Sequence, residues 1–95
     1  MKEIMYELST TKQFRKSLKR FKNSKDVLSE LNDIIEILLQ NNDIPDSYKD
    51  HELVGNMKGL RELHIRPDVL LVYEKQDSII TLLLVNIGSH SELFK

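Results

Sequence analysis

The chain has 95 residues, of which 40% are hydrophobic and 31% charged, as in ordinary soluble globular proteins. A chain of this length closes one hydrophobic core, so we expect a single domain over residues 1–95. The absence of cysteine excludes a disulfide framework, a thiolate nucleophile and a cysteine-based metal site. No apolar run approaches the roughly 18 residues that span a membrane, and the N-terminus lacks a signal peptide's apolar region. We therefore expect a cytoplasmic protein that does not associate with membranes.

The charged residues are segregated along the chain. The net charge of −1 argues against a protein that coats nucleic acid without specificity. Residues 1–25 nevertheless carry eight Lys and Arg against two Glu, whereas residues 26–52 carry one Lys against eight acidic residues. A basic segment can hold a phosphate backbone or an acidic protein, or it can simply be a solvated helix face.

The first half of the chain predicts one strand followed by two helices. Residues 3–8 alternate between apolar and polar, which is typical of a short, half-buried strand. Over residues 12–23, Phe14, Leu18 and Phe21 form a narrow apolar stripe on an otherwise basic helix. Ser24 can cap a second helix that runs to residue 39 with apolar residues spaced three and four apart.

The second half predicts a sheet. Ile44 precedes Pro45 and is pushed out of helical geometry. Extended segments follow at residues 52–54, 59–65, 69–75 and 79–87, separated by turns at 55–56, 66–68 and 76–78. The last segment is almost continuously apolar, which predicts a position at the sheet centre. The order indicates an α+β fold of two layers, with both helices on one face of a sheet whose later strands are antiparallel.

The three histidines, His51, His64 and His90, are the main candidates for chemistry. Each lies at a predicted strand end or turn and has an acidic residue close in sequence. Imidazole titrates near neutrality and serves as general acid or base, although scattered histidines are also common as surface or structural residues. His64 and Asp68 are four apart, but Pro67 excludes the helix that would place both on one metal ion. No motif for a serine hydrolase, a nucleotide hydrolase or a dehydrogenase is present, so we expect neither metal nor cofactor.

Histidines accompanied by cations suit cleavage of an RNA phosphodiester. The ribose 2′-hydroxyl must lose a proton, the phosphorane carries extra negative charge, and the leaving 5′-oxygen must gain a proton. Lys58, Arg61 and Arg66 lie close in sequence to the histidines and could hold that charge.

Six short motifs in order make the chain similar to a known family. They are YKDH at 48–51, LVG at 53–55, KGLR at 58–61, HIRPD at 64–68, LVY at 71–73 and GSHSELF at 88–94. This combination closely resembles the YafQ family, a branch of the RelE-type toxins of bacterial type II toxin–antitoxin systems. The match covers roughly the C-terminal half, while the N-terminal half is similar mainly in its strand and two-helix layout.

The resemblance implies a RelE-like (microbial RNase) fold with a short C-terminal turn, and metal-free, ribosome-dependent cleavage of messenger RNA. The expected partners are a cognate antitoxin of the DinJ/RelB type and the 70S ribosome with mRNA in its A site. By position, His51, His64, Asp68 and His90 match the catalytic residues of the family, with His90 expected as general acid and His51 or His64 as base. Substrate binding is expected at Lys58, Arg61, Glu62, Arg66 and Phe94, and ribosome binding at the basic helix through Lys12, Arg15, Lys16, Lys19, Arg20 and Lys22.

Three positions depart from the family pattern. Glu62 stands where the pattern has aspartate, Met57 where it has tryptophan, and Asn86 where related toxins often have arginine. The longer carboxylate, the absent indole and the absent cation could each rearrange the site. Two alternatives therefore stay open: a non-nucleolytic gyrase inhibitor of the ParE type, and a degenerate toxin that only binds its antitoxin.

Overall fold

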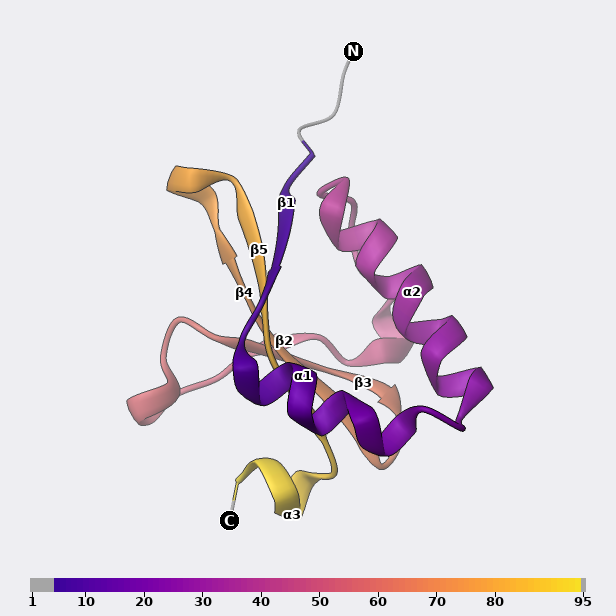
Figure 1. Ribbon diagram of the computed structural model, residues 1–95. Helices are drawn as coiled ribbons and strands as arrows, with labels where there is room; N and C mark the ends of the chain where they lie inside the picture. The colour runs from indigo at the N-terminus through magenta and orange to yellow at the C-terminus, as the bar shows by residue number, and fades with distance from the viewer. Residues whose placement is uncertain (1–4, 95) are drawn as a thin grey trace.

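A computed structural model describes residues 5–94, which form one mixed sheet with helices packed against it (Figure 1). The strands are β1 (Glu7–Thr10), β2 (His51–Glu52), β3 (Arg61–Arg66), β4 (Val69–Gln76) and β5 (Thr81–Gly88). The helices are α1 (Lys12–Leu18), α2 (Lys25–Leu39) and α3 (His90–Leu93). Short 3-10 turns lie at Lys19–Phe21, Asp46–Tyr48, Gly55–Met57 and Asp77–Ile79. The expected α+β fold with two helices ahead of the sheet is confirmed.

The helix α2 supplies most of the helical side of the core. Its stripe of Val27, Leu31, Ile34 and Leu38 is buried, as the spacing of three and four predicts. This stripe and Phe14 of α1 join one apolar cluster with the sheet residues Leu63, Ile65, Val69, Leu71, Tyr73, Leu82, Leu84 and Ile87. Burying each large apolar side chain contributes roughly 1.5–3 kcal/mol, so this contact holds the two layers together.

The strand order is β1-β5-β4-β3-β2, and it differs from the expectation in two respects. The pair β1–β5 is parallel, with Glu7 opposite Thr81, whereas the other pairs are antiparallel. The central strand is β4 rather than β5, in agreement with its uninterrupted burial from Val69 to Tyr73. The strand β5 lies between β1 and β4. Its apolar sequence therefore correctly indicated a strand inside the sheet, although not the central one.

The first strand also lies later than predicted. It runs from Glu7 to Thr10 instead of over residues 3–8, because its hydrogen-bonding partner is the start of β5. Residues 3 and 4 of the predicted strand lie outside the described part of the chain. Thr11 then ends the strand and begins α1, since its hydroxyl accepts a hydrogen bond from the Phe14 amide at 2.9 Å.

The turn between β4 and β5 contains an unfavourable backbone conformation. Ile80 has φ of 50°, and its side chain is 45% exposed. A β-branched residue in the left-handed region costs roughly 1–2 kcal/mol, whereas glycine adopts it freely. The neighbouring Ile79 is similarly exposed, at 64%, but is not among the described residues with positive φ.

We therefore expect Ile80→Gly to be more stable than Ile79→Gly by roughly 1 kcal/mol. The two variants share the entropic cost of a new glycine in the unfolded chain and the loss of an exposed isoleucine. Urea unfolding of both variants would measure the difference. Equal free energies of unfolding would show that the turn relaxes around Ile80 without strain.

Candidate functional site

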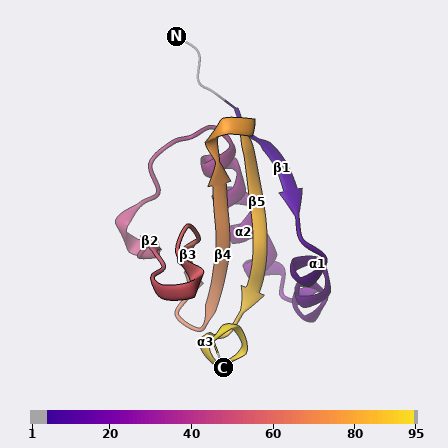
Figure 2. The same ribbon diagram turned by 90° about the vertical axis from the view of Figure 1, so that its left-hand side faces the viewer.

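The face of the sheet opposite α2 carries a row of four paired residues. His51 lies opposite Glu62, Glu62 opposite Val72, and Val72 opposite Asn86. Directly paired residues of neighbouring strands point to the same face. Leu63, which follows Glu62, and Leu71 and Tyr73, which flank Val72, belong to the core under α2, so Glu62 and Val72 point to the opposite face. The row therefore runs across the face that turns toward the viewer in Figure 2, with α2 behind the sheet.

A hollow of about 440 Å³ lies at the His51 end of this row. Four residues predicted for the site line it: His51 from β2, Glu62 from β3, His90 from α3, and Phe94 just after α3. The remaining walls are Leu53, Val54, Asn56 and Met57 from the loop between β2 and β3. The structure thus brings together residues that lie more than 40 positions apart in the sequence.

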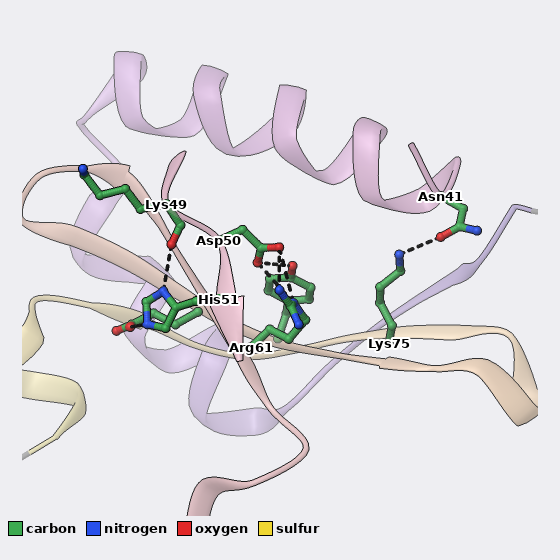
Figure 3. A network of polar contacts seen from close by, with 8 residues as sticks. Asn41, Lys49, Asp50, His51, Arg61 and Lys75 are labelled. Carbon is green, nitrogen blue, oxygen red and sulfur yellow. Dashed lines mark hydrogen bonds and ion pairs between the residues drawn. The ribbon is translucent and has the colours of Figure 1, made fainter. Parts of the chain in front are cut away.

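Both ring nitrogens of His51 face an oxygen. Nε2 lies 2.8 Å from Oε1 of Glu62, and Nδ1 lies 2.8 Å from the carbonyl oxygen of Lys49 (Figure 3). Lys49 has φ of 54°, which ends the preceding 3-10 turn and brings the chain back toward β2. A neutral imidazole carries one N–H, so only the doubly protonated ring can donate to both oxygens. The ring is oriented by two contacts and is well placed to exchange a proton with Glu62.

The Glu62 carboxylate is buried, and only one of its oxygens is used. Its residue is 5% exposed, Oε1 contacts His51, and Oε2 has no hydrogen-bond partner within residues 5–94. A buried carboxylate oxygen without a partner is costly unless another donor binds it. A hydroxyl group entering the hollow could supply that donor.

The short helix α3 holds His90 and Phe94 beside the hollow. Ser89 and Glu92 form a capping box: the Ser89 amide donates to Oε1 of Glu92 at 2.8 Å, and the Glu92 amide donates to Oγ of Ser89 at 3.3 Å. A Cβ on Gly88 would lie 2.8 Å from Oε1 of Glu92, so the glycine leaves room for this cap. The rings of His90 and Phe94 have centroids 5.0 Å apart. The spacing of Ser89 and Glu92 is a capping-box signal that the sequence analysis missed.

A polar network on the other face of the sheet supports β2. Arg61 Nη2 lies 3.1 Å from Oδ2 of Asp50, and the Tyr73 hydroxyl donates to Oδ1 of Asp50 at 2.5 Å (Figure 3). Burial, followed by the hydrogen bond to Asp50, raises the pKa of Tyr73 well above its ordinary value. The hydrogen bond to Asp50 is also the main reason why the pKa of Arg61 is raised. Because Asp50 precedes His51, this network ties the edge strand that carries His51 to β3 and β4.

The two arginines predicted to bind substrate do not line the hollow. Arg61 is held by Asp50, and Nη2 of Arg66 lies 3.2 Å from Asp26 and 3.4 Å from Glu30 on α2. Lys58 is exposed in the loop next to Met57. The structure therefore places the guanidinium groups beside carboxylates and leaves Lys58 as the predicted cation with no ion pair among residues 5–94.

His64 and Asp68 lie apart from the hollow that holds His51 and His90. His64 is two residues beyond Glu62 on β3 and so shares its face, but it lines a separate hollow of about 430 Å³ with Tyr48, Arg66 and Pro67. Asp68 is exposed in the turn after Pro67 and makes no hydrogen bond or ion pair within the described residues.

The predicted basic helix lies beside α3, the helix that carries His90. All six residues predicted to bind the ribosome are exposed: Lys12, Arg15, Lys16, Lys19, Arg20 and Lys22. Arg15 donates to Thr10, and Arg20 forms an ion pair with Glu92 of α3. The side chains of the four lysines form no hydrogen bond or ion pair with residues of the described chain. The basic surface is thus joined to the helix that presents His90.

Comparison with known proteins gives consistent matches over nearly the whole chain. The model of a family described as the bacterial toxin of type II toxin–antitoxin system, YafQ, matches residues 6–95. The mRNA interferase toxin YafQ of Escherichia coli K12 is 30% identical over 92 residues, which is 96% of this chain and 98% of that protein.

Solved structures agree with the sequence matches. A metal-bound toxin from Helicobacter pylori superposes with a TM-score of 0.87 and is 41% identical, covering 95% of this chain and 100% of that one. In the E. coli DinJ–YafQ toxin–antitoxin complex the match has a TM-score of 0.84 and 30% identity, with 97% and 100% covered. In this protein, no three His, Asp or Glu side chains of residues 5–94 are grouped so that they could hold a metal ion. No helix in the same range has the length and apolarity needed to cross a bilayer.

The raised pKa of Tyr73 predicts a loss of stability in alkali. The folded state favours the neutral phenol, so this contribution is complete below the ordinary value of 10.0 and is lost as the pH rises above it. We expect Tyr73→Phe to lower the free energy of unfolding by about 1.5–3 kcal/mol near neutral pH, and to reduce the further loss above about pH 10. Urea unfolding at several pH values would measure both effects.

Tyr6→Phe is the matched control for this prediction. The Tyr6 hydroxyl donates to Asp77 at an exposed site, so its removal should change stability and alkaline sensitivity less. An equal effect of the two substitutions would contradict the role assigned to the Asp50 network.

Proposed function

Because this chain belongs to the YafQ family of bacterial type II toxin–antitoxin toxins and is a homologue of an mRNA interferase, we propose that it cleaves messenger RNA in the ribosomal A site. It would act in the cytoplasm and inhibit translation. The observation that carries the proposal is the single hollow in which His51, Glu62, His90 and Phe94 meet. It offers a proton acceptor, a proton donor and an aromatic surface within one small space.

In the proposed reaction, the ribose 2′-hydroxyl gives its proton to the pair of His51 and Glu62. The 2′-oxygen attacks the adjacent phosphorus, and the bond to the 5′-oxygen breaks. His90 donates a proton to that leaving oxygen, which yields a 2′,3′-cyclic phosphate and a 5′-hydroxyl. The unpartnered Oε2 of Glu62 supports this role, because it can accept a hydrogen bond from the 2′-hydroxyl before the transfer.

The remaining predicted site residues would act on RNA that extends beyond the hollow. Phe94 offers its ring for stacking against a base, as aromatic residues do in other proteins that bind single-stranded RNA. His64 lies further along the same face of β3 and would contact the neighbouring nucleotide, together with Asp68. Negative charge on the phosphorane would be met by protonated His51 and by Lys58, since Arg61 and Arg66 are already paired.

Docking on the ribosome is assigned to the basic helix. Its four unpaired lysines, Lys12, Lys16, Lys19 and Lys22, together with Arg15 and Arg20, present positive charge to ribosomal RNA. This local charge would compensate for the net charge of −1. A cognate antitoxin of the DinJ/RelB type would restrain the toxin, as suggested by the complex of the E. coli relative with DinJ.

The first test is mapping of transcript 5′ ends after brief expression in cells that lack the antitoxin. Wild type should produce in-frame cuts within translated regions, whereas His90→Ala should reduce them at least about 100-fold, because a general acid contributes roughly 10²–10⁴-fold. Growth arrest without new 5′ ends would instead support a gyrase inhibitor. Absence of both arrest and new ends would support a degenerate toxin.

The second test separates docking from chemistry. The double variant Lys16→Glu/Lys19→Glu should weaken binding to 70S ribosomes and lower the slope of log affinity against log salt by about one per lysine. His90→Ala should bind as wild type does. Lys75→Glu is the charge control, because Lys75 contacts Asn41 beyond the C-terminal end of α2, away from the basic helix. Equal loss of ribosome binding in all three variants would rule out this division of roles.

A further inference from the structure

We propose that a second hollow, beside the one that holds His51 and His90, binds an unstacked nucleobase of the mRNA next to the cut. Asn86 would donate a hydrogen bond to an acceptor atom on the edge of that base. The inference rests on the proposed nuclease function and assigns a subsite to it.

The second hollow lies next to the first, along the same row of paired residues across the sheet. It has a volume of about 200 Å³, and Met57 lines both hollows. Val72 and Asn86, which form its floor, follow Glu62 in the paired row across the sheet. Adjacent strands lie about 4.8 Å apart, so two strand spacings, roughly 10 Å, separate the backbones of Glu62 and Asn86. A strand of RNA with its scissile phosphate at Glu62 can therefore reach the second hollow with a neighbouring nucleotide.

The walls suit a flat aromatic ring rather than a phosphate. Val72, Val85, Leu93 and Met57 supply apolar surface, and no Lys or Arg among residues 5–94 lines the hollow. Its volume is below the roughly 300–1,000 Å³ of sites for drug-sized ligands, which favours a single ring system. Apolar walls and stacking are the usual means by which proteins hold a base that is turned out of its strand.

Among the polar side chains that line this hollow, Asn86 is the one whose donor group makes no hydrogen bond within residues 5–94. Thr11 uses its hydroxyl twice, since Oγ1 accepts from the Phe14 amide and donates to the Val85 carbonyl at 2.6 Å. Gln13 donates from Nε2 to Ser17. Asn86 accepts the Ile87 amide at Oδ1 with a distance of 2.9 Å, and this bond identifies which end of the side chain is the oxygen.

The side-chain nitrogen Nδ2 of Asn86 is consequently a donor with no partner among residues 5–94. A donor in an apolar hollow selects ligands with an acceptor, such as the ring nitrogens and carbonyl oxygens on base edges. This is the feature that points to a base rather than to an aliphatic side chain.

The experiment measures kcat/KM on 70S ribosomes that hold an mRNA with a defined A-site codon. A set of mRNAs carries one abasic site at each nucleotide flanking the cut. The test variant is Asn86→Asp, which keeps the acceptor for the Ile87 amide and replaces the donor with an oxygen. Asn32→Asp, at an exposed position of α2, is the control for the added charge. Asn86→Ser provides a second variant, in case Asn86→Asp does not fold.

We expect one abasic position to lower the wild-type kcat/KM at least about tenfold. On intact mRNA, kcat/KM of Asn86→Asp should be lower than that of wild type by a similar factor. On the mRNA with the sensitive abasic site, Asn86→Asp should cut nearly as well as wild type does. Asn32→Asp should behave as wild type on both mRNAs. Such non-additivity would show that Asn86 and this base act together.

Several results would overturn the subsite. The loss caused by Asn86→Asp could be the same on intact and abasic mRNA, or no abasic position could matter. Asn86→Asp could also leave cleavage unchanged but weaken antitoxin binding, which would make the antitoxin the occupant. In each of these cases wild type still cuts mRNA, so the nuclease function survives; if wild type cuts no ribosome-bound mRNA, both proposals fail.

Discussion

The arrangement of the site depends on one constraint, the alternation of side chains in a sheet that α2 covers on one face. Leu63, Leu71 and Tyr73 must point to the core, so the residues between them point to the other face. Glu62 and Val72 are placed in this way, and their partners His51 and Asn86 follow from the register. A slip of one residue in β3 would bury His64 and expose Leu63. The apolar core under α2 therefore sets the positions of the catalytic candidates.

Periodicity predicted the helices and the later strands. The site residues were implied only by the family resemblance; of these, His51, Glu62, His90 and Phe94 line one hollow, whereas His64 and Asp68 lie apart from it. The parallel pairing of β1 with β5 could not be predicted, because a short strand carries no signal that identifies its distant partner. The location of Arg61 could have been predicted, since it alternates with Leu63 and Ile65, which are core residues. Arg66 follows an irregularity in the register, and its pairing with α2 depends on a long-range contact that the local pattern does not contain.

The three departures from the family pattern, Met57, Glu62 and Asn86, all lie at the two hollows on one face. The longer carboxylate of Glu62 still reaches His51, with 2.8 Å between Oε1 and Nε2. Met57 separates the hollows with a flexible apolar side chain, and Asn86 brings a neutral donor where an arginine would bring a cation. The core beneath the sheet contains none of these positions. The changes thus alter what the face can bind without altering how the sheet is packed.

The pairing of β1 with β5 also determines when the sheet can form during synthesis of the chain. The strand β1 is synthesised well before its partner β5 and before the helix α3, which begins with His90. A contact between segments so distant in sequence forms late in folding, after the loop between them has closed. Until both β5 and α3 have been made, the chain has neither a finished sheet nor His90, the proposed general acid. Under the proposed function, the nascent chain therefore cannot cleave the mRNA of the ribosome that is translating it before β5 and α3 have been synthesised.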